Sequence, residues 1–246
     1  MKALILAGSR GGVDPVAAYA GVAHKALIEL DGETLLARVA GAVRGAGCDE
    51  VVVSASAPEV ASEAKRLGLR VLPAEAGPSA SVGRALDELG TPLLVTTADH
   101  ALLEPEWVRR FVADAPADAD VAVLLARRDM VEAASPGVRR TYLRFADGEW
   151  SGCNLFLLRT PAAARAIELW RLVEADRKRP WRIVRRFGPG TLARYLLGRL
   201  TLTDAVARLG RTADVRAATV ASPFGLAAVD VDKPEDLDAV RAIVSR

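Results

Sequence analysis

Short runs of consecutive apolar residues alternate along the first half of the chain with segments whose apolar residues recur at helical spacing. A continuous apolar run is typical of a strand buried in a parallel sheet. Five such runs occur, at residues 2–7, 50–55, 69–74, 92–99 and 120–127. Helical patterns separate them, at residues 34–46, about 58–67, about 79–89 and after Pro105. This alternation predicts an α/β fold with a doubly wound, mostly parallel sheet and right-handed crossovers.

The second half of the chain has a different pattern. Residues 141–147 and 152–159 are typical of a hairpin joined around Gly148, and 161–212 predict several helices broken by prolines and glycines. We therefore expect one domain, residues 1–246, that carries a helical insertion near 161–212.

Strand-like sequence returns near the end of the chain. Residues 214–221 and 227–232 are apolar runs, and a final helix is expected after Pro234. We expect the last of these strands to rejoin the main sheet.

The composition narrows the class of protein. The chain has 246 residues, of which 51% are hydrophobic, so it can bury a substantial core. A net charge of +2 and 5% aromatic residues argue against nucleic-acid binding. Cys48 and Cys153 lack metal-ligand spacing, which fits a reducing compartment. The first apolar run is too short for a signal peptide, and no apolar stretch reaches membrane-spanning length, so we expect a cytoplasmic protein without a transmembrane segment.

A glycine-rich segment follows the first predicted strand. It reads Gly8-Ser9-Arg10-Gly11-Gly12, and Lys25 lies one loop beyond it. Glycines let backbone N–H groups approach phosphate oxygens, and basic side chains add charge-assisted contacts. The segment matches neither a Walker A loop nor G-x-G-x-x-G, so an ordinary βα turn remains an alternative to a phosphate site.

Carboxylates follow two of the predicted strands. Asp99 ends the run at 92–99, and Asp230 and Asp232 lie in the run at 227–232, on one strand face by alternation. Ligands of open α/β sheets bind at the carboxyl ends of the strands. A carboxylate near Asp99 would complete an oxygen-rich Mg²⁺ site together with phosphate oxygens. Helix capping is the alternative role for Asp232.

Five stretches together resemble one family. They are LAGSRGG…HKALIELDGETLL, VTTADH, GPSASVGRAL, SGCNLFLLR and VDVDKPEDL. In this order and spacing they resemble the MobA-like nucleotidyltransferases, over nearly the whole chain except the 161–212 helices. The sequence departs from the family pattern with Ser9 in place of a glycine, an early Arg10, His24 before the lysine and Lys233 before Pro234.

The resemblance implies a Rossmann-like fold and transfer of a nucleoside monophosphate from an NTP to an acceptor phosphate. Magnesium, with manganese as an alternative, would be the cofactor, and CTP, then GTP, the donor. Arg10 and Lys25 would be catalytic, and Asp99 and Asp232 would hold the metal. The implied nucleotide-binding residues are Ala7, Gly8, Ser9, Arg10, Gly11, Gly12, Lys25, Ser79, Ser81 and Asp99.

The acceptor side of the site is expected to be basic. Residues 177–216 contain eleven Lys or Arg and two Asp. They predict either a solvated helical face or a site for an anionic, phosphorylated small acceptor. The candidate acceptor-binding residues are Arg139, Arg140, Gly152, Asn154, Lys178 and Arg182. Residues 190–200 are amphipathic, and core packing, a peripheral membrane contact or a homodimer interface would each explain them.

Three other function classes remain open at this point. A metal-dependent glycosyltransferase of similar fold would use a sugar nucleotide, although its usual D-x-D is replaced here by Asp99-His100-Ala101. A non-catalytic regulator would bind NTP without turnover. A nicotinamide oxidoreductase is disfavoured, because no acidic ribose-binding residue ends the strand at 50–55.

Overall fold

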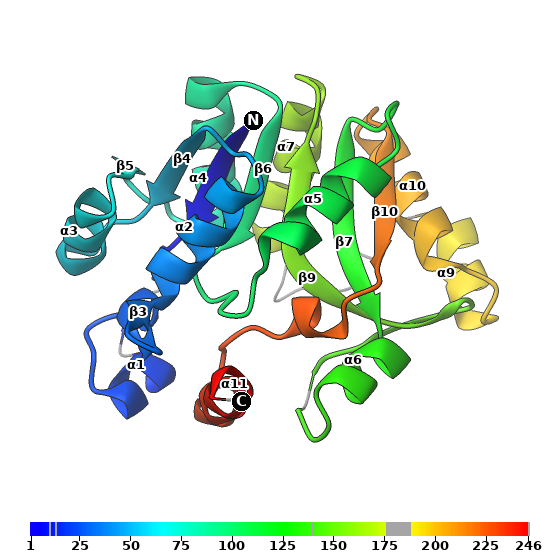
Figure 1. Cartoon of the computed structure of the whole chain (residues 1–246). Coiled ribbons are helices and arrows are strands. Elements are labelled where there is room, and N and C mark those ends of the chain that lie inside the picture. The colour runs from blue at the N-terminus through cyan, green and yellow to red at the C-terminus, as the bar shows by residue number, and fades with distance from the viewer. Residues whose placement is uncertain (10, 13, 139, 176–187, 246) are drawn as a thin grey trace.

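An eight-stranded mixed sheet forms the centre of the molecule (Figure 1). The computed structural model describes residues 1–9, 11–12, 14–138, 140–175 and 188–245. The sheet has the order β10-β7-β9-β6-β1-β4-β5, with β8 paired to β9. Its strands are β1 Lys2–Leu6, β4 Glu50–Ser54, β5 Arg70–Leu72, β6 Leu93–Thr97, β7 Val121–Arg127, β8 Leu143–Phe145, β9 Gly148–Leu158 and β10 Ala217–Ser222. A separate hairpin joins β2 (Glu29–Leu30) to β3 (Glu33–Thr34).

The predicted mostly parallel α/β sheet is confirmed. β1 pairs in parallel with β4 and β6, β4 pairs with β5, and β7 pairs with β10. The long strand β9 runs antiparallel to both β6 and β7, and β8 forms the expected hairpin with it.

Helices cover both faces of the sheet. The α-helices are α1 Pro15–Ala20, α2 Leu35–Gly45, α3 Pro58–Arg66, α4 Pro78–Leu89, α5 Pro105–Asp114, α6 Arg128–Ala134, α7 Ala163–Ala175, α9 Pro189–Leu196, α10 Leu202–Thr212 and α11 Pro234–Val244. Alternate side chains of β1 supply both cores: Ala3 and Ile5 pack with α2 and α5, whereas Leu4 packs with α4 and α7. None of the helices that the structure describes is long and apolar enough to cross a membrane.

The sequence prediction for residues 227–232 is wrong. They form no strand: a 3-10 helix, η2, spans Gly225–Ala228, and extended backbone without strand pairing follows. Val229 and Val231 are fully buried, so their alternation with polar residues has the appearance of a strand. A backbone hydrogen bond, from Val231 N to Asp99 O at 3.0 Å, ties the segment across the end of β6. The helices α1 and α6 were not predicted at all, because both are too short to show helical periodicity.

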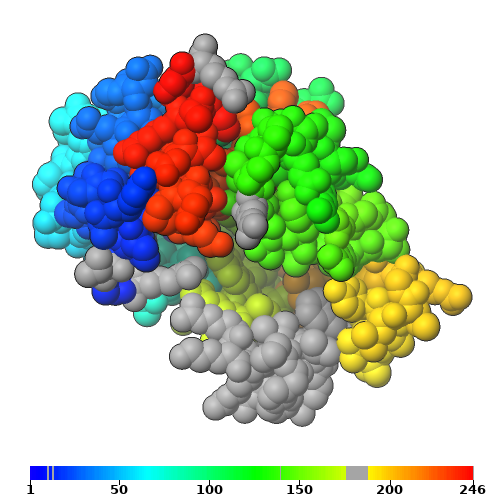
Figure 2. Space-filling view, turned by 90° about the horizontal axis from the view of Figure 1, so that it is seen from below, coloured from blue at the N-terminus to red at the C-terminus, as the bar shows by residue number. Residues whose placement is uncertain are grey.

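The carboxyl ends of the parallel strands meet at one edge of the sheet, at the bottom of Figure 1. Figure 2 looks onto this edge and shows α11 in red between the blue N-terminal segment and the green segment that holds α6. The surface is hollowed below this row, and the yellow segment of α9 lies at one side of the hollow. The β1–α1 loop, the end of β6 and the 225–233 segment therefore converge on one region.

Candidate functional site

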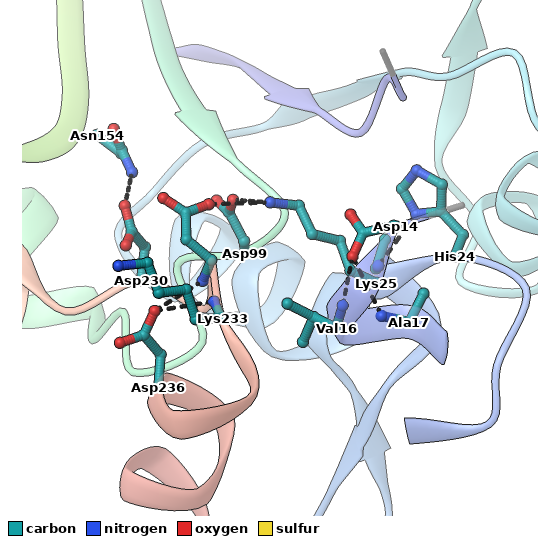
Figure 3. A network of polar contacts seen from close by, with 12 residues as sticks. Asp14, Val16, Ala17, His24, Lys25, Asp99, Asn154, Asp230, Lys233 and Asp236 are labelled. Carbon is teal, nitrogen blue, oxygen red and sulfur yellow. Dashed lines mark hydrogen bonds and ion pairs between the residues drawn. The ribbon is translucent and has the colours of Figure 1, made fainter. Parts of the chain in front are cut away.

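Lys25 pairs with two carboxylates at this edge of the sheet, and Figure 3 shows its side chain reaching toward Asp99. Its Nζ donates to Asp99 Oδ2 and, at 3.3 Å, to Asp232 Oδ1. Asp99 follows β6 and is almost completely buried, whereas the side chain of Asp232 is 59% exposed. These three residues come from widely separated parts of the sequence, and the fold brings them together as one charged cluster.

The electrostatics of the cluster keep Lys25 and Asp99 ionised. Burial alone would raise the pKa of Asp99, but the Lys25 ammonium holds that pKa below its usual range. Burial works against the Lys25 charge in the same way, yet Asp99 and Asp232 raise the pKa of Lys25 above its ordinary value. The pKa of Asp232 is raised by partial desolvation of its carboxylate at the cluster and by the nearby Asp230 carboxylate. The cluster therefore holds one cation among acidic groups, with Asp232 the most easily protonated of them.

Local capping interactions place Lys25 in this position. The Asp14 carboxylate accepts hydrogen bonds from Val16 N and Ala17 N and starts α1, and a left-handed Gly21 ends that helix. His24 then caps the 3-10 helix η1, Lys25–Leu27, because its Nδ1 accepts a hydrogen bond from Ala26 N at 3.1 Å. Burial and the neighbouring ammonium lower the pKa of His24, which keeps the ring neutral and able to accept.

A second charged cluster surrounds Asp230. Arg140 Nη1 donates to Asp230 Oδ1, and Asn154 Nδ2 donates to Asp230 Oδ2 at 2.7 Å. The Arg140 and Asp230 side chains are only 11% and 10% exposed. Both Asp230 oxygens are therefore occupied by neighbouring side chains, while Asp232 faces Lys25.

Asn154 owes its position to an irregularity in β9. The register between β7 and β9 shifts between Val123 and Leu125, and Asn154 has a φ of +48°. Asparagine is one of the few residues that readily adopt this left-handed conformation. Bulges of this kind redirect a side chain, and here the amide is turned onto Asp230.

The predicted phosphate loop lies against the loop that joins β5 to α4. A Cβ at Gly8 would contact the Cβ of Ala74 at 3.4 Å, so the loop after β1 and the loop after β5 are neighbours. Ser81 accepts a hydrogen bond on its Oγ from Glu75 N at 2.9 Å. The glycines at 11 and 12 both have positive φ values, 77° and 83°, a conformation in which a side chain would be strained.

The carboxylate of Glu174 occupies the amino terminus of α4. Ser79 Oγ and, at 3.3 Å, Ser79 N both donate to Glu174 Oε2. The helix has no side-chain cap of its own, because its N-cap is Gly77. A Cβ at Gly77 would overlap the Glu174 carboxylate, so the glycine makes room for this contact. Glu174 belongs to α7, which links the predicted insertion to the predicted base-binding loop.

The remaining predicted site residues divide into two groups. Gly152 is exposed on β9 opposite Leu125, and the end of β1 leads into Ala7 and Ser9. Arg10, Arg139, Lys178 and Arg182 lie outside the described residues, so their predicted roles stay predictions.

The cluster around Lys25 suits a divalent cation. Asp99 Oδ1 is a buried oxygen with no hydrogen-bond partner among the described residues, and Asp232 is partly open to solvent. Hard oxygen ligands of this kind are those that Mg²⁺ prefers. Within the described part of the chain, no three His, Cys, Asp or Glu side chains are grouped as a metal site. Two carboxylates would therefore leave further ligand positions to water and substrate phosphate oxygens.

Comparison with known proteins gives the family. The family model described as MobA-like NTP transferase domain matches residues 3–186. The chain belongs to the MobA-like NTP transferase family. It is accordingly a nucleotidyltransferase, as the sequence motifs implied. Enzymes of this and related families generally use a divalent metal ion. No curated protein matches the sequence significantly.

Several solved structures share the fold. A hypothetical transferase from Thermus thermophilus is 33% identical, with a TM-score of 0.82, over 96% of this chain and 98% of that one. A 4-diphosphocytidyl-2C-methyl-D-erythritol synthase is 16% identical, with a TM-score of 0.62, over 100% and 97%. A CMP:2-keto-3-deoxy-manno-octonic acid synthetase complexed with CTP is 17% identical, with a TM-score of 0.55, over 100% and 99%. At such low identity the last two are evidence for the fold alone.

Sequence reasoning missed one residue near the site and left the role of another open. Glu174 falls within the helices predicted over 161–212, and no local signal in the sequence marks it. Asp230 was considered as a metal ligand, whereas its partners are Arg140 and Asn154. Helix α11 begins at Pro234, as predicted, but Asp232 does not cap it: its N-cap is Lys233, and the Asp236 carboxylate accepts from Lys233 N at 2.9 Å and Asp232 N at 3.2 Å. Asp232 is thus left to face Lys25 rather than to cap the helix.

Proposed function

We propose that this nucleotidyltransferase moves a nucleoside monophosphate from an NTP, CTP in the first place and GTP next, to a small phosphorylated acceptor. The observation that carries the proposal is the Lys25 ammonium paired with both Asp99 and Asp232, at the end of β6, where Thr97 pairs with Leu6 just before the glycine loop. Opposite charges held at the carboxyl edge of an α/β sheet suit a reaction in which negative charge moves along a triphosphate.

The chain's own residues would bind and orient the donor. Backbone N–H groups from Gly8 to Gly12 would approach the phosphates, because glycines permit close approach. Lys25 would stabilise the charge that develops on the transferring and leaving phosphate oxygens. We assign Asp99 and Asp232 as metal ligands, in preference to Asp230, since both Asp230 oxygens already accept from Arg140 and Asn154.

The bound magnesium ion would neutralise phosphate charge and polarise the α-phosphoryl group. In the transfer itself, an acceptor phosphate oxygen forms a bond to the α-phosphorus, and the bond from that phosphorus to the oxygen bridging to the β-phosphate breaks. Pyrophosphate leaves with that electron pair. The attacking oxygen is already anionic, so the step needs no strong general base, and positioning and electrostatics supply the catalysis.

The choice of CTP rests on analogy in fold. Two structural neighbours are described by cytidine chemistry, one as a CTP complex and one as a diphosphocytidyl product synthase. The base would lie near Ser79 and Ser81, where the loop after β5 meets the glycine loop. On the acceptor side we retain Arg139, Arg140, Gly152, Asn154, Lys178 and Arg182 as candidates. Arg140 and Asn154 already donate to Asp230. To bind the acceptor, they would either contact it while keeping these hydrogen bonds or release Asp230 when the acceptor binds.

A cytoplasmic location is part of the proposal. Cys48 and Cys153 are both buried and unpaired with each other, as expected in a reducing compartment.

The decisive experiment is thermal unfolding with ATP, CTP, GTP, UTP and a sugar nucleotide, each with and without Mg²⁺. Ligand at about 100 times its Kd adds roughly 2.7 kcal/mol, so binding is readily measured. We expect one NTP to give a Mg²⁺-dependent shift that Asp99→Ala abolishes, followed by pyrophosphate release with phosphorylated acceptors. A shift with the sugar nucleotide only would contradict the proposal and favour a glycosyltransferase. NTP binding without pyrophosphate release for any acceptor class would favour a regulator.

A further inference from the structure

Three consecutive large apolar side chains are exposed at the end of α9. Tyr195, Leu196 and Leu197 are 47%, 73% and 67% exposed. We call these three residues the α9 patch. Single exposed apolar residues are common on protein surfaces, but a contiguous apolar group is typical of an interaction site.

The α9 patch is held in place by the sheet. Ala146 N donates to Leu200 O at 2.8 Å, and Leu202 N donates to Asp147 Oδ1 at 2.9 Å, which joins the segment after α9 to the β8–β9 hairpin. The Tyr195 ring meets Phe145 of β8 edge-on, with 6.0 Å between ring centroids. Leu196 and Leu197 are therefore carried on an anchored element and yet face solvent.

The sequence around the α9 patch is rich in basic residues. Residues 177–203 contain eight Lys or Arg and no Asp or Glu. Within the described part, the exposed Arg194 directly precedes the α9 patch, and the exposed Arg199 follows it after Gly198. Arg194 also reaches Asp204 at 3.4 Å, whereas no ion pair is found for Arg199 among the described residues. Apolar side chains bordered by arginines are typical of segments that lie in the interface of an anionic membrane.

We propose that the α9 patch docks this enzyme on an anionic lipid surface, with Leu196 and Leu197 entering the headgroup region and Arg194 and Arg199 contacting lipid phosphates. Charge complementarity decides between the possible occupants. A second copy of the chain would bring the same basic residues against themselves in a symmetric contact, which like charges disfavour. Each basic residue near an anionic leaflet favours binding instead.

The position of α9 suits a docked enzyme. In Figure 2 the yellow segment of α9 lies at the rim of the hollow on the face that carries the carboxyl ends of the strands. Docking through this rim would hold the enzyme at the lipid surface without requiring a spanning helix, and no described helix is suited to span. The proposal stands independently of which NTP the enzyme uses.

The test is co-sedimentation of the full-length protein with lipid vesicles. Vesicles of phosphatidylcholine with 30% phosphatidylglycerol are compared with pure phosphatidylcholine vesicles, at about 0.1 M and 0.5 M salt. The variant is Leu196→Ser with Leu197→Ser. The matched control is Leu172→Ser, which changes a leucine 48% exposed on α7, a helix well separated from α9 in Figure 1. Thermal unfolding checks that both variants remain folded.

We expect binding to the anionic vesicles to exceed binding to the neutral ones at least tenfold, and to fall several-fold at the higher salt. The double variant should lose at least tenfold in binding, and the control should bind like the wild type. Failure of the wild type to bind anionic vesicles overturns the proposal. So does undiminished binding by the double variant. Retention on single-stranded RNA without vesicle binding, or a dimer that the double substitution dissociates, would assign the patch to another partner and would also overturn it.

Discussion

The Arg140–Asp230 pair gives the sharpest test of how the charged residues are arranged. Both side chains are about nine-tenths buried, and the second Asp230 oxygen accepts from Asn154 at 2.7 Å. Replacing Asp230 by alanine would leave the Arg140 guanidinium buried without its counter-charge. Breaking a buried pair in this way costs about 3–5 kcal/mol.

We therefore expect Asp230→Ala to lower the free energy of unfolding by about 3–5 kcal/mol. In a chain of this length, this corresponds to a fall in melting temperature of roughly 6–20 °C. The measurement is urea unfolding at pH 7, with the slope m compared between variants to verify that the unfolding transition is the same. The matched control is Asp114→Ala, which breaks an exposed pair with Arg110 on α5. It should cost less than about 1 kcal/mol.

A second variant distinguishes the effect of the Arg140–Asp230 charges from the effect of the volume that the two side chains fill. Arg140→Met with Asp230→Leu replaces the pair by apolar side chains of similar length, and such replacements are often neutral or better. We expect it to recover most of the stability lost in Asp230→Ala. The reasoning would be refuted if Asp230→Ala behaved like Asp114→Ala, or if the double replacement were as unstable as the single one.

The remaining predictions concern the cluster around Lys25 and the start of α4. Lys25→Met should lower the kcat for pyrophosphate release about 10²–10³-fold, because a positive charge aimed at the phosphates is lost, and a loss under tenfold would exclude that role. The pKa of Asp99 lies below its usual range, so its stabilisation is present above the unfolded value of about 3.9 and is lost as pH falls through the folded value. The melting-temperature difference between the wild type and Asp99→Asn should therefore shrink below pH 4, and a constant difference from pH 6 to pH 3 would contradict this. Glu174→Ala should lower the free energy of unfolding, measured in urea, by about 0.5–2 kcal/mol, since it removes the carboxylate that caps α4. Gly77→Ala should add nothing further in the Glu174→Ala background, because the new methyl fills the space vacated there, and additive losses would show that the two residues do not meet.

The sequence was most informative where one pattern had one structural explanation. The runs at 2–7, 92–99 and 120–127 are continuous and apolar because β1, β6 and β7 are buried by helices or strands on all sides. The family motifs likewise placed Lys25 and Asp99 at the same edge, since both follow strands whose carboxyl ends meet there.

The hydrophobic pattern gave a wrong prediction where residues are buried without being paired in the sheet. Val229 and Val231 are buried by crossing over the end of β6, and an alternating sequence cannot distinguish this from a strand. Arg140 and Asp230 are 90 residues apart, and their pairing depends on tertiary structure alone. The sequence pointed to Asn154 only through the SGCNLFLLR motif. Its left-handed backbone conformation follows from the register shift between β7 and β9, which depends on how the strands pair.

The order in which the charged residues occur along the chain has a consequence for synthesis. Lys25 and Asp232 are 207 positions apart, and Asp232 follows the last strand, β10. A nascent chain folded only as far as β10 would hold Lys25 and Asp99 but would lack both Asp232 and the partner of Arg140. Contacts of such long sequence separation form late in folding. An unfinished chain could thus form most of the sheet before it gains the ability to turn over substrate, and activity would report that the C-terminal segment has been made and folded.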